Sequence, residues 1–465
     1  MAAASTPDGT SDKAHDAVLT LDEPSASQRG KHAAEPALVA IFADGRPVMR
    51  VFPLHGGRLE IGRSADGLPD DLLASRRHAE VRLVAGTWVI TDLGSRNGTH
   101  VNGVRLGTAA LEVPSGQRLV LRMGGRLYLV CEDATDFRSH GVRKRDDMVI
   151  GPTLAAALER VREAGRTGEN LLVLGESGAG KELAARTYHA AGSRADAPFV
   201  AVNCAAIPEG LAERLLFGST RGAYSGATDA VGHIQAAHGG TLFLDEVGEL
   251  APAVQAKLLR VLESREVTPL GASRAQAVAV RFCFATLRHL RLLVAEQGFR
   301  ADLFFRIART TVTLPPLRQR VEEIPWLIAG ALGALDAKLV AHASLAEACA
   351  LAEWPGNVRE LLTSVRHAAG AAQRSGTTTV RAAHLPIDIP IAVMRAGATT
   401  AERPPGSDTL DPGSLPEDIS AEQLRAAVEA QRGNLAAAAR ALGVNRSTLY
   451  RLLERHGIAR PPRHG

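Results

Sequence analysis

The sequence is poor in aromatic residues, carries little net charge and has no long apolar run. Phe, Trp and Tyr make up 4% of 465 residues, and 54 basic against 50 acidic residues leave a formal charge of +4. No run approaches the roughly 18 apolar residues of a membrane span, and the N-terminus has no signal-peptide core. These absences predict a soluble, cytoplasmic protein without a membrane partner.

The chain also lacks patterned cysteines. Its thiols show no CxxC spacing, so the sequence predicts neither a zinc site nor a disulfide framework. Unpatterned thiols fit a reducing cytoplasm. The four cysteines are Cys131, Cys204, Cys283 and Cys349.

The length predicts about two to four domains, and a composition of 45% hydrophobic and 22% charged residues is globular. Residues 1–36 show no apolar period and are expected to form a disordered leader. Residues 37–132 hold short apolar runs between Gly, Asp and Asn turns, which predict a β-sandwich. The charged stretch 133–147 is interpreted as a linker.

The second half of the chain changes pattern twice. Apolar strands alternate with helical periods over residues 148–392, which predicts a parallel α/β domain that is helical only beyond Leu314. Residues 393–419 are rich in Gly, Pro, Ser and Thr and predict a flexible linker. Residues 420–465 predict a small all-α module with a Gly-centred turn. The fold class is therefore multidomain.

A glycine-rich loop follows the strand pattern LLVL and precedes a helical run. Its glycines let backbone amides surround a phosphate, the helix N-terminus adds its dipole, and the lysine neutralises the outer phosphates. Glu182 replaces the usual hydroxyl residue, so a direct hydroxyl ligand to Mg²⁺ is missing. The nucleotide-binding residues expected here are Gly175, Glu176, Ser177, Gly178, Ala179, Gly180, Lys181 and Glu182.

A second strand pattern supports this site. The run Thr241-Leu242-Phe243-Leu244 ends in two carboxylates, Asp245 and Glu246. We expect Asp245 to hold Mg²⁺ through water and Glu246 to activate the attacking water.

These segments resemble the AAA+ domain of bacterial enhancer-binding proteins, the ATPases that remodel sigma-54 RNA polymerase. The matching motifs, in order, are GESGAGKE, VNCAAI, GGTLFLDEVGEL, QAKLLRVLE, FRADLFFRI, LPPLRQR and WPGNVREL. The resemblance implies ATP and Mg²⁺ as cofactors and assembly into a ring, with a hexamer as the expected form.

The resemblance also implies roles for single residues. Asn203 would be the switch that reports on Glu246, Arg300 and Arg306 would be fingers reaching the neighbouring subunit's ATP, and Arg359 would be the sensor in the helical lid. Thr286 is retained at the first sensor, but Leu287 stands where the family usually has Asn.

One loop resembles the family's GAFTGA motif, the tip that grips sigma-54. Tyr224 keeps an aromatic ring and Ser225 keeps a hydroxyl at the two substituted positions. The expected sigma-54 contacts are Gly222, Ala223, Tyr224, Ser225, Gly226 and Ala227.

The N-terminal β-rich module resembles a forkhead-associated (FHA) domain, a phosphothreonine-binding module. Arg63 and Ser75 would hold the phosphate, Arg96 would assist, and Asn97 would hold the peptide backbone. His78 matches the histidine that braces the Ser75 loop. The alternative is a β-sandwich whose surface binds nothing.

The C-terminal module resembles a Fis-type helix-turn-helix that reads upstream enhancer DNA. Gly443 permits the turn before the second helix. The residues expected at the major groove are Asn445, Arg446, Ser447, Thr448, Tyr450 and Arg451.

Together these features predict an ATP-dependent activator of sigma-54 RNA polymerase holoenzyme, regulated by a phosphothreonine-containing protein. We expect residues 37–132 to bind peptide as an isolated fragment, and their deletion to leave ATP hydrolysis intact. Two alternatives remain: a DNA-binding regulator or scaffold with a degenerate ATPase, which Leu287 favours, and an AAA+ regulator of another polymerase form, which the GAFTGA-like loop disfavours.

Overall fold

The computed structural model describes residues 34–65, 67–145, 148–223, 228–386 and 424–425. The chain divides into two compact units, residues 1–394 and 395–465. The expected linker 393–419 lies outside the described residues, as does the C-terminal module apart from Leu424 and Arg425. Among the described helices, none is long and apolar enough to cross a membrane.

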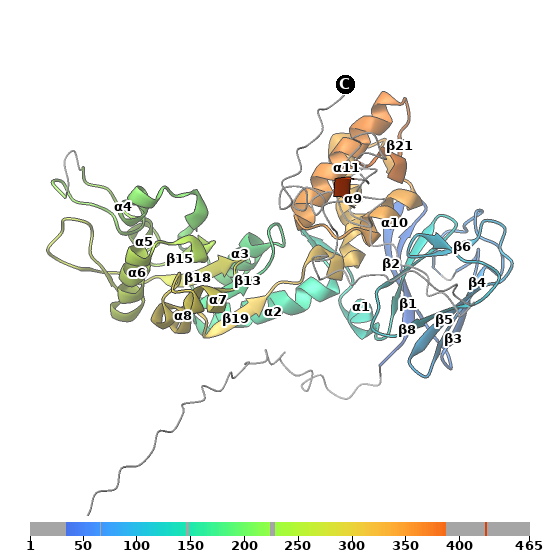
Figure 1. Ribbon diagram of the computed structural model, residues 1–465, viewed down its shortest axis with the longest axis horizontal. Helices are drawn as coiled ribbons and strands as arrows, with labels where there is room; N and C mark the ends of the chain where they lie inside the picture. Colours follow the sequence, from blue (N-terminus) through green and yellow to red (C-terminus); the bar gives the residue numbers. More distant parts are fainter. Residues whose placement is uncertain (1–33, 66, 146–147, 224–227, 387–423, 426–465) are drawn as a thin grey trace, which may run out of the picture. The chain divides into compact units, whose positions relative to one another are not determined.

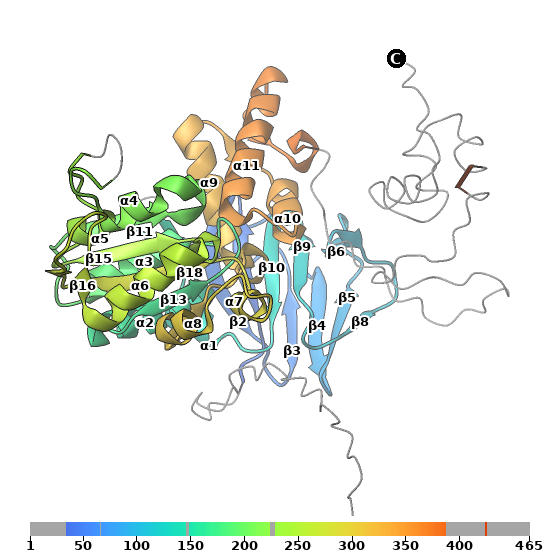
Figure 2. The same ribbon diagram turned by 60° about the vertical axis from the view of Figure 1, so that its left-hand side comes forward.

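The N-terminal module is a sandwich of two antiparallel sheets, as its turn-punctuated apolar runs predict (Figure 2). The first sheet has the order β2 (Arg46–Pro53), β1 (Ala37–Ala43), β10 (Arg126–Cys131), β9 (Leu119–Met123), β6 (Thr99–Val101) and β7 (Val104–Arg105). The second has the order β3 (Arg58–Ile61), β4 (Ala79–Val84), β5 (Thr87–Asp92) and β8 (Leu111–Pro114). A core that includes Leu38, Trp88 and Tyr128 fills the space between the sheets.

The segment interpreted as a linker has its own structure. It holds α1 (Thr135–Ser139) and β11 (Arg143–Arg145), and β11 pairs with β12 (Met148–Ile150) in an antiparallel ribbon. The helix α1 contacts β2 and the following helix, α2 (Pro152–Thr167). The connection is therefore packed against both of its neighbours.

The central domain is built on a parallel five-stranded sheet (Figure 1). Its order is β14 (Phe199–Asn203), β15 (Thr241–Asp245), β18 (Arg281–Thr286), β13 (Leu171–Leu174) and β19 (Thr310–Thr313). One face packs on α2 and α3 (Lys181–Ala191), and its core includes Leu158, Val173 and Tyr188. This is the α/β arrangement expected from alternating strand and helix patterns.

The opposite face of the sheet is covered by a second group of helices, whose core includes Leu172, Leu258 and Leu303. These helices are α4 (Ala212–Phe217), α5 (His233–Ala236), α6 (Pro252–Ser264), α7 (Leu290–Ala295) and α8 (Ala301–Ile307). A short ribbon pairs β16 (Glu266–Val267) with β17 (Gln276–Ala277). Because Leu171 and Val173 face one core and Leu172 faces the other, β13 is buried on both sides.

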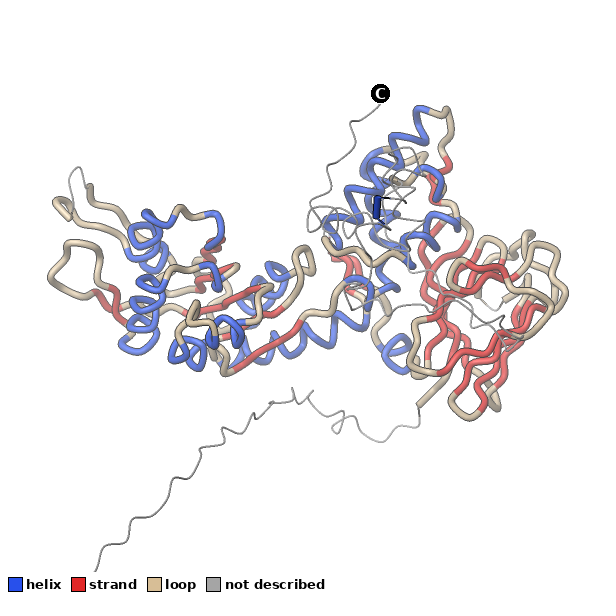
Figure 3. Tube along the Cα trace, in the orientation of Figure 1, coloured by secondary structure: helices blue, strands red, loops and turns tan. Residues whose placement is uncertain are grey.

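The lid follows β19 and is mainly helical (Figure 3). Its helices are α9 (Ile324–Leu335), α10 (Ala343–Leu351) and α11 (Asn357–Arg374), preceded by the 3₁₀ turns η4 (Leu317–Gln319) and η5 (Val321–Glu323). The prediction of helices alone was incomplete, because β20 (Val340–Ala341) pairs in parallel with β21 (Thr379–Val380). The remaining 3₁₀ turns are η1 (Cys204–Ala206), η2 (Glu209–Leu211), η3 (Val247–Glu249) and η6 (Ala382–His384).

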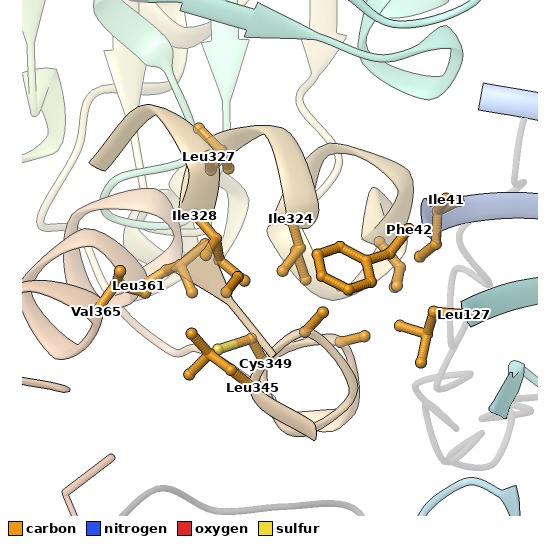
Figure 4. Packing of buried hydrophobic residues seen from close by; sticks show 14 of the residues in the cluster. Ile41, Phe42, Leu127, Ile324, Leu327, Ile328, Leu345, Cys349, Leu361 and Val365 are labelled. Atoms are coloured by element: carbon orange, nitrogen blue, oxygen red, sulfur yellow. The ribbon is translucent and has the colours of Figure 1, made fainter. Parts of the chain in front are cut away.

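The sandwich and the lid share one apolar core. The cluster joins Ile41 and Phe42 of β1 and Leu127 of β10 to Ile324 of α9 and Leu345 of α10 (Figure 4). The expectation that ATP hydrolysis survives deletion of residues 37–132 stays a prediction, although the module is not structurally separate from the lid. Its deletion would expose this apolar surface of the lid.

Candidate functional sites

The phosphate loop connects the end of β13 to the start of α3, as predicted. Gly178 has φ of 71°, a conformation that L side chains rarely adopt, and a Cβ there would lie 2.4 Å from the Gly356 carbonyl oxygen. The first glutamate of the loop, Glu176, accepts two hydrogen bonds from Arg318, at 2.7 and 2.9 Å. The loop therefore contacts the lid at two places, through Gly178 and through Glu176.

Lys181 and Glu246 meet at the carboxyl edge of the parallel sheet. Lys181 Nζ donates to Glu246 Oε1 at 2.8 Å and to the Gly175 carbonyl at 3.2 Å. The second carboxylate oxygen of Glu246 accepts the backbone N–H of Leu287 at 3.0 Å. Glu246 itself has φ of 51°, so its backbone occupies a strained conformation. Strand ends far apart in sequence thus place one carboxylate beside the phosphate loop.

Asp245 and Thr286 lie on neighbouring strand ends. Asp245 Oδ1 accepts the N–H of Glu246 at 3.0 Å, and burial raises the pKa of the Asp245 carboxyl although Lys181 opposes that effect. Thr286 is fully buried and its hydroxyl accepts the N–H of Arg288 at 3.0 Å. The Leu287 side chain is 55% exposed, so this residue contributes a backbone group to the site.

Asn203 occupies the expected strand end but has a local partner. It pairs in register with Asp245, and its Oδ1 accepts the N–H of Ala205 at 3.0 Å. Among the hydrogen bonds of the described residues, none joins Asn203 to Glu246. Its role as a switch stays a prediction.

The lid contributes Arg359 to the same site. A cavity of about 370 Å³ is lined by Ser177 of the phosphate loop and by Arg359, together with Gly356, Glu360, Thr363 and Ser364 of the lid. Sequence reasoning gave no role to Asn357, whose Nδ2 donates to Glu176 and to the Ser177 carbonyl, both at 3.0 Å. Asn357 and Arg318 belong to WPGNVREL and LPPLRQR, so both signals were present in the sequence.

A buried ionic cluster fastens the base of the lid. Arg320 is 1% exposed and donates to Glu323 at 3.0 Å and to the Ala179 carbonyl at 3.2 Å. Glu323 in turn accepts the N–H of Gly151 at 2.8 Å. Burial raises the pKa of Glu323 to about 7, and the nearby Arg320 only partly offsets this effect. The cluster connects the lid, the phosphate loop and the start of the domain.

The two expected fingers lie on or beside α8. Arg300 precedes the helix and forms a two-bond ion pair with Asp302, at 2.7 and 3.0 Å, while its N–H donates to Gln255. Arg306 donates to the Leu262 carbonyl at 3.2 Å. Glu182 lies on the exposed face of α3 and pairs with Arg186 at 2.8 Å. These three residues do not contact Glu246 through any described hydrogen bond.

The GAFTGA-like loop leaves the domain between α4 and α5. Its base is closed by two hydrogen bonds between Ser219 and Ala230, at 3.0 and 2.9 Å, and Thr220 N–H donates to Leu270 of a neighbouring loop at 2.9 Å. Gly222 and Ala223 follow this base. Tyr224, Ser225, Gly226 and Ala227 lie outside the described residues, as do Asn445, Arg446, Ser447, Thr448, Tyr450 and Arg451.

The expected phosphothreonine residues converge at one edge of the sandwich. Arg63 N–H donates to the Ser75 carbonyl at 2.9 Å, and Ser75 Oγ accepts the N–H of Arg96 at 3.1 Å. Asn97 Nδ2 donates to the Leu73 carbonyl at 2.6 Å. Two guanidinium groups and a hydroxyl are therefore carried by adjoining loops, an arrangement suited to a phosphate dianion.

Buried polar residues fix these loops. His78 is fully buried, accepts the N–H of Ser75 at Nδ1 and lies 3.2 Å from the Gly98 carbonyl through Nε2. Asp92 accepts the hydroxyls of Ser95 and Thr99, both at 2.6 Å. Although burial opposes its ionisation, these hydrogen bonds lower the pKa of Asp92 to about 2.

Three family models match the chain in the order that the sequence predicts. An FHA domain matches residues 57–122, a Sigma-54 interaction domain matches residues 149–313, and a Bacterial regulatory protein, Fis family, matches residues 415–456. The last match falls on the unit that the structure scarcely describes.

Curated proteins with similar sequences are regulators. The acetoin catabolism regulatory protein of Cupriavidus necator is 37% identical over 407 residues, which cover 80% of this chain and 59% of that protein. The nitric oxide reductase transcription regulator NorR1 of the same organism is 40% identical over 333 residues, covering 67% and 64%. The chain thus spans about three fifths of the length of these relatives.

A solved structure, NtrX from Brucella abortus, is 29% identical with a TM-score of 0.50, and the match covers 70% of each chain. The order of the three matched segments, together with the regulators of similar sequence, identifies the group. The chain belongs to the family of sigma-54-dependent transcriptional activators and combines an FHA domain, a sigma-54 interaction domain of the AAA+ fold and a Fis-type helix-turn-helix.

Proposed function

We propose that this protein hydrolyses ATP to activate transcription by sigma-54 RNA polymerase holoenzyme from upstream DNA sites. The observation that carries the proposal is the Lys181–Glu246 pair, which unites the phosphate loop with the end of β15. Ser177 of the same phosphate loop lines a cavity together with Arg359 of the lid. The arrangement has the parts that phosphoryl transfer requires: a phosphate cradle, a cation and a carboxylate.

The first step of the chemistry is phosphate binding. Backbone amides at the N-terminus of α3 would bind the phosphates, and Lys181 would neutralise the outer ones. A bound phosphate competes with Glu246 for Lys181, and Glu246 is then able to accept a proton from the attacking water. The Leu287 N–H would keep that carboxylate oriented, since it already holds Oε2 at 3.0 Å.

The residues present fit Mg²⁺. Asp245 and Glu246 supply the hard oxygen donors that this ion prefers, and Asp245 Oδ1 is held by a backbone N–H. We assign Asp245 to Mg²⁺ through water. The ion would neutralise phosphate charge, while Glu246 orients the water and Lys181 holds the phosphate.

Hydrolysis would require a neighbouring subunit in a ring, with a hexamer as the proposed form. Arg300 is exposed and paired with Asp302, so a neighbour's triphosphate has an accessible guanidinium to recruit. An arginine supplied across a subunit boundary stabilises the charge of the transition state. Arg306 is the second proposed finger and Asn203 the proposed switch.

Input and output would lie on the other modules. The loop of residues 222–227 would contact sigma-54. In the cytoplasm, residues 445–448, Tyr450 and Arg451 would enter the major groove of upstream DNA. The site formed by Arg63, Ser75, Arg96 and Asn97 would bind a phosphothreonine-containing protein. Support for this input comes from the convergence of these residues on adjoining loops.

Transcription with purified sigma-54 holoenzyme on a supercoiled template tests the proposed ATP-dependent activation. Wild type with ATP should yield transcript, whereas wild type without ATP and Glu246→Gln with ATP should yield none. Normal hydrolysis without transcript would favour the regulator of another polymerase form. Absence of hydrolysis by assembled wild type would favour the DNA-binding scaffold.

A further inference from the structure

The FHA sandwich and the ATPase lid are joined through an unusual strand, β1. Each of its residues is buried, because Leu38 and Ala40 face the sandwich core whereas Val39 and Ile41 face the lid. A register shift between Ala40 and Phe42 then directs Phe42 to the lid side as well. The strand β1 therefore contributes side chains to two cores, one within the sandwich and one shared with the lid.

Two arginines on one edge of this interface cross to the lid. Arg122 Nε lies 2.5 Å from Glu347 Oε2 of α10. Arg118 Nη1 donates to the Arg318 carbonyl at 2.7 Å, and its Nη2 donates to the Leu351 carbonyl at 3.5 Å. Glu353 lies 3.9 Å from Arg118 and 3.7 Å from Arg318, between the two cations.

Arg318 carries this contact to the phosphate loop. Its guanidinium donates both hydrogen bonds to Glu176, and Asn357 donates to the same carboxylate. Arg318 therefore contacts an FHA residue through its backbone and a phosphate-loop residue through its side chain. A single residue, Arg318, thus connects the FHA domain to the phosphate loop.

Arg118 is also connected to the phosphothreonine edge. Its carbonyl accepts Asn102 Nδ2 at 3.1 Å, and Asn102 closes the turn after β6. At the start of β6, Thr99 donates to Asp92, the carboxylate that also holds Ser95. The strand β6 therefore connects the loop that contains Arg96 and Asn97 to Asn102, the residue that contacts Arg118.

We propose that Arg118 is a positioning residue that couples phosphopeptide binding at the FHA edge to ATP binding at the phosphate loop. The coupling runs through Arg318 and Glu176, and it rests on the proposed ATPase and FHA functions. Coupling between sites is reciprocal, so ATP should change phosphopeptide affinity by the same factor as phosphopeptide changes ATP affinity. The FHA domain would then regulate the nucleotide site directly.

The test measures the Kd of a non-hydrolysable ATP analogue for the full chain. Arg118→Ala should weaken binding about fivefold or more, because the Arg318 backbone loses its donor and Glu176 loses a fixed partner. Arg77→Ala is the matched control, since Arg77 is an exposed FHA arginine that pairs with Glu60. Arg118→Lys keeps the positive charge but lacks the guanidinium that donates to the Arg318 and Leu351 carbonyls. It is the second variant to measure if Arg118→Ala does not fold.

A second arm adds a degenerate phosphothreonine peptide library or its unphosphorylated counterpart. The phosphorylated library should shift the analogue Kd of wild type and of Arg77→Ala, and the shift should be lost in Arg118→Ala. Two results would overturn the coupling. In the first, folded Arg118→Ala binds the analogue as tightly as Arg77→Ala does. In the second, the phosphorylated library shifts the analogue Kd of both variants equally.

Two further variants separate this inference from the proposed function. Retention of analogue binding by Lys181→Ala would contradict the nucleotide site itself, and library binding by Arg63→Ala would contradict the FHA site. If wild type binds no library, the phosphopeptide input fails and the coupling fails with it. A loss of affinity in Arg118→Ala would then show only a structural bond between the domains.

Discussion

Lys181 Nζ lies 2.8 Å from Glu246 Oε1, although 65 residues separate the two in the chain. The contact places a cation for phosphate next to a carboxylate for water. It also means that removal of either partner leaves the other without its ion pair in a largely buried setting.

The first prediction separates ATP binding from hydrolysis. Lys181→Ala should abolish ATP binding, whereas Glu246→Gln should bind ATP but turn over at least ~100-fold more slowly, the scale of losing a catalytic base. Isothermal titration and phosphate release on the same preparations measure the two quantities. Equal turnover in wild type and Glu246→Gln would contradict the assignment of Glu246.

The second prediction concerns assembly. Since Arg300 is expected to act on a neighbour's ATP, mixing Arg300→Ala with Glu246→Gln subunits should recover part of the turnover that each lacks alone. Specific activity of wild type should also rise with protein concentration. Activity per subunit that stays constant on dilution to monomer would count against a finger supplied in trans.

The third prediction follows from the buried Glu323. Its pKa is raised by burial from a reference of 4.5 to about 7, so the unfolded chain binds fewer protons than the folded one between these values. The free energy of unfolding should therefore fall as pH rises through this window, by on the order of 3 kcal/mol from this group. Arg320, Glu322 and the Gly151 N–H face the same carboxyl.

Denaturant unfolding of wild type and Glu323→Gln at pH 5 and pH 8 checks this prediction. The variant has no titrating group at this position, so its stability should change less between the two pH values than that of wild type. The same pH dependence in both proteins would show that other groups cause it.

Sequence patterns predicted the phosphate loop because its chemistry depends on local spacing. The same holds for Asp245 and Glu246, which end an apolar strand. Contacts of the backbone were not predictable in this way. The N–H of residue 287 donates to Glu246 whichever side chain that residue carries. The presence of Leu287 in place of Asn, which favoured a degenerate motor, therefore leaves this backbone contact in place.

The shared core of the sandwich and lid shows a different gap between sequence and structure. The run ALVAIFA is one of the short apolar runs that predict the sandwich, but it lacks the alternation of a strand with one solvated face. This continuous apolar pattern was the available signal for burial on both sides. The partner could not be identified from it, because the lid residues that cover β1, such as Ile324 and Leu345, lie far along the chain from Phe42.

The fourth prediction tests whether the FHA sandwich and the lid unfold together. Trp88 lies in the sandwich and Trp326 and Trp354 lie in the lid, so Trp→Phe variants yield chains with reporters on one side only. Both reporters should show the same denaturant midpoint. Phe42→Ala should lower both by the same amount, with a cost of about 3–5 kcal/mol for a buried Phe.

Leu121→Ala perturbs the sandwich alone, since Leu121 belongs only to the core between the sheets. If the sandwich and the lid unfold together, this variant should also lower both midpoints. If the two modules are independent, Phe42→Ala will shift the Trp88 midpoint and leave the lid reporters unchanged. That result would refute the shared core.

The last prediction concerns Asp92, which touches no peptide but fixes the loop that would. Asp92→Ala removes the acceptor of the Ser95 and Thr99 hydroxyls, so Arg96 and Asn97 should lose their fixed positions and phosphothreonine affinity should fall about tenfold. Glu60→Ala is the control, because Glu60 is an FHA carboxylate paired with the exposed Arg77. Calorimetry with a peptide selected from the library by wild type measures the affinities.

The pH dependence of the same binding distinguishes the loop from the ligand. With its pKa lowered to about 2, Asp92 stays ionised through the working range, so its hydrogen bonds to Ser95 and Thr99 persist from pH 7 to pH 5. The phosphate has a second pKa of about 6 and loses charge over that interval. Affinity of wild type should therefore fall as pH is lowered, because the ligand becomes protonated. A difluoromethylene phosphonate analogue, whose fluorines lower the second pKa, should move the midpoint downward. If the pH midpoint of binding is the same for both ligands, a titrating group of the protein controls the affinity.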